Sequence, residues 1–257
     1  VPFHMWAPDI YEGAPTPVTI FLAVASKAAG FAVFVRVFLT AFPYHADHWV
    51  PIIAFLAAIT MILGNLAAIP QQNIKRMLAY SSIAQAGYLL VGLVAANQLG
   101  VKGILFYTMI YVFANVGAFA VTIVFNNVSE SDDIADYSGL AQRSPLLAAT
   151  LLICMLSMAG IPPLAGFAGK FYLFSAVIDQ GFLWLAIIGL VMSMISVYYY
   201  LSVARVMYLG QVTDYSAIKV NGSMKLLLYG CMILSIILGV YPDALAQIAN
   251  TAAKFMF

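Results

Sequence analysis

Two lysines in this sequence occupy positions where a charged residue is costly. Lys27 lies near the middle of an apolar run over residues 17–42, and Lys170 follows the helix-breaking sequence Gly160-Ile161-Pro162-Pro163 in another run. A lysine at the centre of a membrane span costs about 2.5–3.5 kcal/mol on insertion scales, so it usually faces a bundle interior or a wet cavity. Because an amine can take up and release a proton, these positions predict ion or proton movement within a membrane.

Each of these lysines also has an ordinary alternative. Lys27 can extend its side chain to the lipid headgroups, and Lys170 can act as an anchor at the membrane interface. The small neighbours of Lys27 in Ala23-Val24-Ala25-Ser26-Lys27-Ala28-Ala29-Gly30 leave room for water and close helix packing. Carbonyl groups released by the helix break can accept the protons of Lys170. Both observations favour the relay role.

A third lysine, Lys75, begins a span in Asn73-Ile74-Lys75-Arg76-Met77-Leu78. Adjacent Lys and Arg residues at a helix end are often topology anchors, so position alone leaves an anchor and a relay role open. Polar residues recur at helical spacing after Lys75 and in later spans. Such stripes can hold water, but they also join helices by packing. The candidates for a polar pathway are Ser82, Gln85, Tyr111 and Asn115. The same stripes also contain Ser81, Tyr88, Tyr107, Ser193, Ser196 and Tyr200.

The entry segment before the first span contains His4, Asp9 and Glu12. Several prolines and a glycine make it a structured turn. His4 can titrate near neutral pH, so it joins the possible polar pathway. A capping or loop-fixing role for the two acids is at least as good an explanation. The acidic run Glu130-Ser131-Asp132-Asp133 is most simply a solvated loop.

The composition is that of an integral membrane protein. Hydrophobic residues make up 64% of the 257 residues and charged residues 8%, against about 25% charged residues in soluble domains. The mean hydropathy is +0.98, and the net charge of +1 argues against a nucleic-acid partner. Cys154 and Cys231 lie in apolar runs without metal-type spacing, and no glycine-rich phosphate loop is evident. We therefore expect no metal site and no cofactor bound by this chain.

The apolar pattern predicts an all-α, polytopic transmembrane helix bundle of about seven spans in a single membrane domain over residues 1–257. A straight helix over 145–178 would be about 50 Å long, against a hydrocarbon core of roughly 30 Å. Pro162 and Pro163 remove backbone donors there, so we expect a discontinuous helix broken near 160–167. The predicted segments are 17–42, 49–69, 77–96, 101–126, 145–178, 182–209 and 225–256.

The distribution of Lys and Arg predicts the orientation of these spans. One side carries Lys75, Arg76, Arg143, Arg205, Lys219 and Lys225, whereas the other carries Lys102, Lys254 and Arg36. The first side is assigned to the cytoplasm, together with the loops near 70–76, 127–144 and 210–224. The chain begins Val1-Pro2-Phe3-His4 without a signal-peptide pattern. We therefore expect a fragment of a longer polypeptide.

Three segments carry a family resemblance. They are Pro2-Phe3-His4-Met5-Trp6-Ala7-Pro8-Asp9 with the residues to Val18, Asn73-Ile74-Lys75-Arg76-Met77-Leu78-Ala79-Tyr80-Ser81-Ser82-Ile83, and Gly160-Ile161-Pro162-Pro163-Leu164-Ala165-Gly166-Phe167-Ala168-Gly169-Lys170-Phe171. Together they resemble the antiporter-like membrane subunits of respiratory complex I, a proton-pumping NADH:quinone oxidoreductase. Ala25-Ser26-Lys27-Ala28 is similar to the subunit N branch (subunit 2 in organellar and cyanobacterial forms), whereas the subunit L branch tends to carry His at this position.

The resemblance implies an inverted-repeat fold of about fourteen helices, of which this chain is roughly the second half. It implies that Lys27 links two half-channels, that Lys75 belongs to a mid-membrane polar axis, and that Lys170 lies on the broken helix near the exit. NADH, FMN, iron–sulfur clusters and quinone would bind to partner subunits. The implied partners are sibling antiporter-like and other membrane subunits in a bacterial plasma (inner) membrane. Two alternatives share the fold: a multi-subunit sodium antiporter and an energy-converting hydrogenase.

Overall fold

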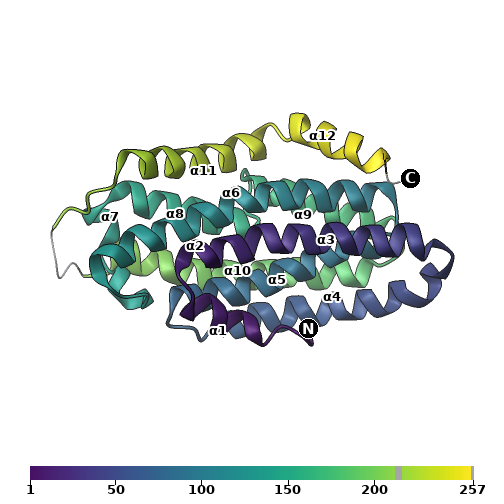
Figure 1. Cartoon of the computed structure of the whole chain (residues 1–257), viewed down its shortest axis with the longest axis horizontal. Coiled ribbons are helices and arrows are strands. Elements are labelled where there is room, and N and C mark those ends of the chain that lie inside the picture. Colours follow the sequence, from purple (N-terminus) through teal and green to yellow (C-terminus); the bar gives the residue numbers. More distant parts are fainter. Residues whose placement is uncertain (212–215, 256–257) are drawn as a thin grey trace.

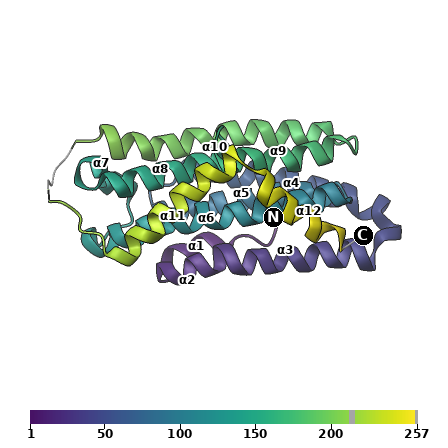
Figure 2. The same ribbon diagram turned by 90° about the horizontal axis from the view of Figure 1, so that it is seen from above.

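The computed structural model describes residues 1–211 and 216–255, which form a helical bundle without a β-strand. Its long helices lie side by side along the long axis of the molecule (Figure 1). Seen from above, α3 and α10 lie on opposite sides of the bundle, with α5 and α6 between them (Figure 2). The elements are α1 Trp6–Gly13, α2 Thr16–Phe21, η1 Leu22–Ser26, α3 Lys27–Arg36, η2 Val37–Ala41, η3 Pro43–His45, α4 Ala46–Ala68, α5 Ile74–Val94, α6 Gln98–Ser129, η4 Ile134–Tyr137, α7 Leu140–Arg143, α8 Pro145–Ala159, α9 Ala165–Ile178, α10 Leu183–Leu209, α11 Gly222–Val240 and α12 Asp243–Lys254.

Six helical stretches are long and apolar enough to cross a membrane: Thr16–Ala41, Pro43–Ala68, Ile74–Val94, Gln98–Ser129, Leu183–Leu209 and Gly222–Val240. Two shorter apolar helices, α8 and α9, follow one another along the chain. The polytopic all-α fold predicted from the apolar pattern is therefore confirmed. The chain is a multi-pass membrane protein.

The predicted break in the run 145–178 is confirmed, and it extends over residues 160–164. Helix α8 ends at Ala159, the next residue Gly160 has a φ of 87° in the left-handed region, and α9 begins at Ala165. Glycine adopts this conformation without the steric cost that a Cβ atom brings. Pro162 and Pro163 lack the N–H groups that would continue the helix.

The prediction of one final span over 225–256 was wrong. Helix α11 ends at Val240, and a separate helix α12 begins at Asp243. Pro242 separates them, because proline disfavours helical geometry in the residue before it. On α12 the buried residues Ala246, Ala249 and Ala253 share one face, which packs against α6. Helix α12 is therefore a short amphipathic helix that continues the bundle after a bend.

The first span changes its helical hydrogen-bonding pattern immediately before Lys27. Residues Leu22–Ser26 form a π-helical turn between α2 and α3, and a second π-helical turn covers Val37–Ala41. Such turns insert an extra residue into an α-helix and are frequent at functional sites. The turn therefore sets the direction in which Lys27 leaves the helix.

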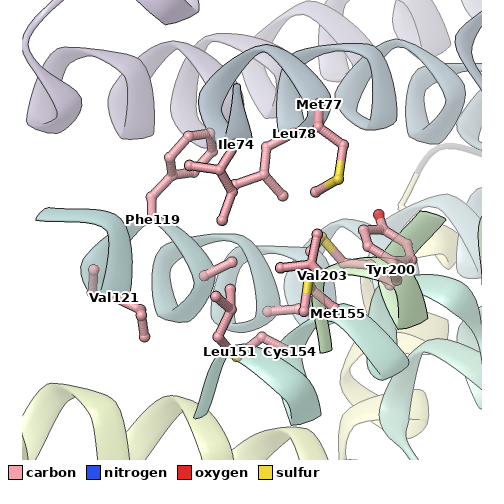
Figure 3. Packing of buried hydrophobic residues seen from close by; sticks show 14 of the residues in the cluster. Ile74, Met77, Leu78, Phe119, Val121, Leu151, Cys154, Met155, Tyr200 and Val203 are labelled. Atoms are coloured by element: carbon pink, nitrogen blue, oxygen red, sulfur yellow. The ribbon is translucent and has the colours of Figure 1, made fainter. Parts of the chain in front are cut away.

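The interior is an apolar packing of α5, α6, α8 and α10 (Figure 3). Ile74 and Leu78 from α5 meet Phe119 from α6, and Leu151 from α8 belongs to the same buried cluster. In a membrane, close packing of this kind stabilises helix association mainly through dispersion, because lipid tails are as apolar as the side chains. This packing fixes the frame in which the polar residues meet.

Three loops lie together at one end of the bundle, as the charge pattern predicts. Asn73 forms an isolated antiparallel bridge with Asp133. The Ser138 hydroxyl donates to the carbonyl oxygen of Gln211 at 2.7 Å, and the Ile218 N–H donates to that of Arg143 at 3.3 Å. The loops near 70–76 and 127–144 therefore lie at the same end of the bundle as the described residues 211 and 218.

Candidate functional site

Lys27 reaches from α3 to polar atoms of two neighbouring helices. Its Nζ donates to the carbonyl oxygen of Ser82 at 2.8 Å and to the Ser82 hydroxyl at 2.5 Å on α5. It also donates to the Tyr111 hydroxyl at 3.1 Å on α6 and lies 4.5 Å from the centroid of that ring. Three acceptors match the three protons of an ammonium group. The side chain therefore points into the bundle, and the predicted alternative of a headgroup contact was wrong.

Lys170 is held in the same way on the other side of the bundle. Its Nζ donates to the carbonyl oxygen of Ala159 at 2.9 Å and to the Ser193 hydroxyl at 2.8 Å. It lies 4.2 Å from the centroid of the Tyr88 ring, and the residue is only 4% exposed. Each lysine thus has one serine hydroxyl, one backbone carbonyl and one tyrosine ring around its ammonium. Neither has a carboxylate partner among the residues described.

The helix break supplies the carbonyl group that binds Lys170. In an unbroken helix, the carbonyls of Met158 and Ala159 would accept from residues 162 and 163. Both of these residues are prolines, so they have no N–H to donate. Lys170 takes the Ala159 carbonyl, and the Gln85 side chain donates to the Met158 carbonyl at 3.1 Å. The break therefore creates two buried acceptors on the polar interior.

A row of hydrogen bonds leads away from Lys170. The Ser193 hydroxyl donates to the Tyr88 hydroxyl at 3.3 Å, and that hydroxyl also accepts from the Asn65 amide at 3.4 Å. The Tyr199 hydroxyl donates to the Asn65 side-chain oxygen at 3.1 Å. Helices α4, α5 and α10 each contribute to this part of the row.

The same row continues to the residue next to Ser82. The rings of Tyr199 and Tyr200 are in contact, with centroids 4.5 Å apart. The Tyr200 hydroxyl forms a hydrogen bond with the Ser81 hydroxyl on α5. Because Ser81 precedes Ser82, the polar row that starts at Lys170 ends one residue from the acceptor of Lys27. We call this chain of residues 170, 193, 88, 65, 199, 200 and 81 the hydroxyl row.

A second polar connection starts at Gln85, which lies on the same face of α5 as Ser81 and Tyr88. The Tyr107 hydroxyl donates to the side-chain oxygen of Gln85. Tyr107 and Tyr111 line a cavity of about 10 Å³ together with Ser157, a volume at the lower limit for one water molecule. This connection leads from Tyr111, which contacts Lys27, toward the helix break.

Lys75 lies apart from the hydroxyl row. It is in the first turn of α5, and its Nζ forms an ion pair of 2.6 Å with Asp132, the two side chains being 9% and 15% exposed. The Asn126 amide donates to the other carboxylate oxygen of Asp132 at 3.1 Å. The acidic run is therefore not simply a solvated loop. The structure brings Lys75 to this loop, not to Lys27 or Lys170, which differs from the placement implied by the family resemblance.

The remaining candidates are not part of either connection. The His4 ring nitrogen Nδ1 is 3.2 Å from the carbonyl oxygen of Pro2 in its own segment. Asn115 is buried and donates weakly to the Met158 sulfur at 4.0 Å, and its side-chain oxygen has no partner in the described part of the chain. Ser196 bonds to the carbonyl of Ser193 in its own helix. Of the predicted polar residues, Ser82 and Tyr111 bond directly to Lys27 and Ser193 bonds to Lys170, whereas Gln85 belongs to the second connection.

The entry segment holds α1 against α5. Arg76 forms ion pairs with Asp9 at 2.9 Å and with Glu12 at 2.6 Å, which confirms the loop-fixing role of these acids. Tyr11 on α1 is buried, and its hydroxyl is 3.4 Å from the Ser82 hydroxyl. The segment therefore positions the serine that binds Lys27.

The family described as "NADH:quinone oxidoreductase/Mrp antiporter, TM" matches residues 1–196. The chain belongs to this family. It is 61% identical to NADH-quinone oxidoreductase subunit N of Heliobacterium modesticaldum, over 100% of this chain and 55% of the relative. Among solved structures, a chain of respiratory complex I from Thermus thermophilus with bound aureothin is 35% identical, with a TM-score of 0.82 over 96% of this chain and 54% of that one. A chain of the Mrp complex from Dietzia is 20% identical with a TM-score of 0.92, covering 100% of this chain and 56% of that one, and shows the shared fold alone.

The chain spans about half the length of the curated relatives it matches. Sequence reasoning missed two residues of its hydroxyl row, Asn65 and Tyr199, and the ion-pair partner Asp132. Asn65 is a single amide deep in the apolar α4 helix, and this isolation was a usable signal. Tyr199 offered no comparable signal, because a run of tyrosines does not show which ring turns inward.

Within residues 1–211 and 216–255, no group of three or more His, Cys, Asp or Glu residues is arranged to hold a metal ion. Cys154 and Cys231 are free and buried in the apolar interior, where they serve as small apolar side chains.

Proposed function

We propose that this chain is the proton-conducting half of a membrane subunit of a proton-translocating NADH:quinone oxidoreductase. The observation that carries the proposal is that Lys27 and Lys170, both without a carboxylate partner among the described residues, lie at opposite ends of the buried hydroxyl row. The row is hydrogen-bonded except at the Tyr199–Tyr200 ring contact and between the chain neighbours Ser81 and Ser82. Hydroxyl groups both donate and accept hydrogen bonds, so they can pass a proton along a row. We propose that a bridging water carries the proton past Asn65 and between Tyr199 and Tyr200. The similarity to subunit N supports the assignment to this enzyme class.

The two lysines are the titrating ends of the proposed relay. At about 4 Å and an effective dielectric constant of 20, two unit charges interact by about 4 kcal/mol. A charge that appears beside either ammonium therefore changes its proton occupancy strongly. Asn65 is not titratable and acts as a positioning residue that holds Tyr88 and Tyr199 in line.

Each lysine also borders a cavity, and Ser193 of the hydroxyl row lines the one at Lys170. Lys27 lines one of about 610 Å³ with Phe3, and Lys170 lines one of about 600 Å³ with Phe171. We propose that protons enter and leave the relay near these two cavities, which other subunits would cover in the assembled complex. The relay role of Lys75 stays a prediction, because its ion pair with Asp132 fits an anchor at least as well.

We further propose that the chain is one membrane domain and binds no redox cofactor. NADH, FMN, iron–sulfur clusters and quinone would then belong to partner subunits, and electron transfer there would change the protonation of the relay. The proposed partners are sibling antiporter-like subunits and the smaller membrane subunits that connect them to the quinone site. The proposed location is the bacterial plasma membrane, with the loops near 70–76, 127–144 and 210–224 in the cytoplasm.

The test is the variant Lys27→Ala in the full-length subunit within its assembled complex. We expect assembly to persist, and proton uptake into inverted membrane vesicles and coupled quinone reduction to fall at least about tenfold, because the amine that starts the relay is missing. Lys254→Ala, which removes an exposed lysine on α12, is the control and should change neither rate.

Two outcomes would contradict the proposal. One is wild-type proton uptake in an assembled Lys27→Ala complex, which would remove Lys27 from the relay. The other is cation/proton exchange by the full-length protein alone in liposomes, without any redox subunit, which would favour the antiporter function over the NADH:quinone oxidoreductase.

A further inference from the structure

A basic groove lies at the loop end of the bundle, where α8 and α11 begin. Its volume is about 550 Å³, and its walls come from the ends of the 210–224 loop and the first turns of these two helices. The cationic side chains in its lining are Arg143, Lys219 and Lys225, and the others include Leu146, Ile218 and Tyr229. The groove is separate from the hydroxyl row and has no part in the proposed relay.

Positive charge in this groove is carried by Lys219 and Lys225. Both are exposed, and neither forms an ion pair within the described residues. Arg143 lines the groove too, and its guanidinium donates to Ser216 at 3.2 Å. None of the residues that line the groove is acidic. The groove therefore attracts an anion.

The groove lies where a membrane span meets the aqueous phase. Helix α11 begins at Gly222 and is apolar enough to cross a membrane, while α8 begins at Pro145. Directly after Lys225, the helix exposes Leu226 at 76% and Tyr229 at 47%. Tyrosine is enriched at the headgroup level, and leucine suits the hydrocarbon below it. Cationic groups thus stand beside an apolar helix face open to lipid.

We propose that this groove binds the headgroup of an anionic phospholipid. The phosphate lies between Lys219 and Lys225, and the acyl chains run along the exposed face of α11 that carries Leu226 and Tyr229. The positive end of the helix dipole of α11, which begins at Gly222, adds to the attraction for the phosphate. Basic pockets between transmembrane helices on the cytoplasmic side bind anionic headgroups for these reasons. A zwitterionic lipid lacks the net charge that the lysines recognise.

The experiment uses the full-length subunit in its assembled complex, reconstituted in phosphatidylcholine nanodiscs with a trace of photoactivatable phosphatidylglycerol. After illumination, mass spectrometry measures the lipid cross-linked to the segment 216–229. We expect the phosphatidylglycerol probe to label this segment strongly, and a photoactivatable phosphatidylcholine probe to label it weakly. The double variant Lys219→Gln/Lys225→Gln should reduce labelling by about fivefold for each lysine, as expected for basic residues at an anionic membrane surface.

Two further variants separate lipid recognition from misfolding and from general charge loss. Lys219→Arg/Lys225→Arg keeps the charge and should keep most of the labelling. Arg205→Gln removes an exposed cation of α10 that does not line the groove, and it should leave labelling unchanged.

Three results would overturn the proposal. Equal labelling by the two lipid probes would show a plain apolar groove. Equal losses in Arg205→Gln and in the double Gln variant would show a general surface effect. Loss of labelling in millimolar inorganic phosphate at constant ionic strength would assign the groove to free phosphate instead of a lipid headgroup.

Discussion

The ammonium of Lys170 donates a hydrogen bond of 2.9 Å to the carbonyl oxygen of Ala159, the last residue of α8. That carbonyl is available because the residue that would donate to it in a continuous helix is Pro163. The helix break therefore provides the acceptor that holds Lys170. The span is interrupted at the point where this buried cation needs a hydrogen-bond acceptor.

Gly160→Ala should disturb this feature directly. Gly160 has φ of +87°, and a Cβ atom added there would meet the Cδ of Lys170 at 3.0 Å. We expect a loss of about 1–2 kcal/mol in the free energy of unfolding from backbone strain, and a several-fold fall in proton uptake because Lys170 is displaced. Thermal unfolding of the purified complex and proton uptake in vesicles measure the two effects.

The chain offers a matched control for this variant. Gly181 has φ of +85° but open space around its Cβ position, so Gly181→Ala brings the same strain without touching Lys170. If both variants lowered proton uptake equally, strain alone would explain the loss, and the contact with Lys170 would be unimportant.

Lys27→Arg should be nearly as inactive as Lys27→Ala. Arginine keeps the positive charge but does not release its proton under any physiological condition. Its planar group is also larger than the ammonium that fits among the Ser82 oxygens and Tyr111. Proton uptake and quinone reduction in vesicles provide the measurement. Near-normal uptake in this variant would mean that Lys27 contributes only a fixed charge.

Tyr200→Phe should interrupt the hydroxyl row with little change in shape. The variant removes the hydroxyl that bonds to Ser81 and should cost about 1 kcal/mol of stability, as for other buried hydrogen bonds. Proton uptake should fall several-fold, because Ser81 then loses its hydroxyl partner in the row. Tyr198→Phe, at a residue that is 66% exposed, should change neither property. If Tyr200→Phe and Tyr198→Phe took up protons at the same rate, the Tyr200 hydroxyl would not be needed. The Tyr107–Gln85 connection would then be the better candidate for the relay.

Asp132→Asn should destabilise the loop end of the bundle. The change leaves the Lys75 ammonium, whose side chain is only 9% exposed, without its carboxylate. We expect a loss of about 2 kcal/mol, below the cost for a fully buried ion pair because some water reaches this one. Chemical unfolding in detergent gives the value.

The neighbouring variant Asp133→Asn changes an exposed acid with no ion pair in the described structure, and it should cost almost nothing. If Asp132→Asn were as mild, the Lys75 ion pair would not hold the loop. The relay role for Lys75 would then become the better explanation of its position.

The sequence by itself predicted the class of fold, a helix break near 160–167 and the buried positions of Lys27 and Lys170. Runs of apolar residues fix the spans because backbone groups in lipid must satisfy each other. Two adjacent prolines stop a helix whatever surrounds them. A lysine in the middle of such a run cannot be placed in lipid at low cost, so its burial was predictable as well.

Only the tertiary structure showed which polar residues form hydrogen bonds with these lysines. Ser82 and Tyr111 meet Lys27 from two helices, and Asn65 joins the hydroxyl row from a third, because packing sets how each helix is rotated. Local sequence gives the spacing of residues along one helix, whereas the rotation and depth of a helix depend on all its neighbours. The ion pair between Lys75 and Asp132 shows this as well, since it joins a helix end to a distant loop.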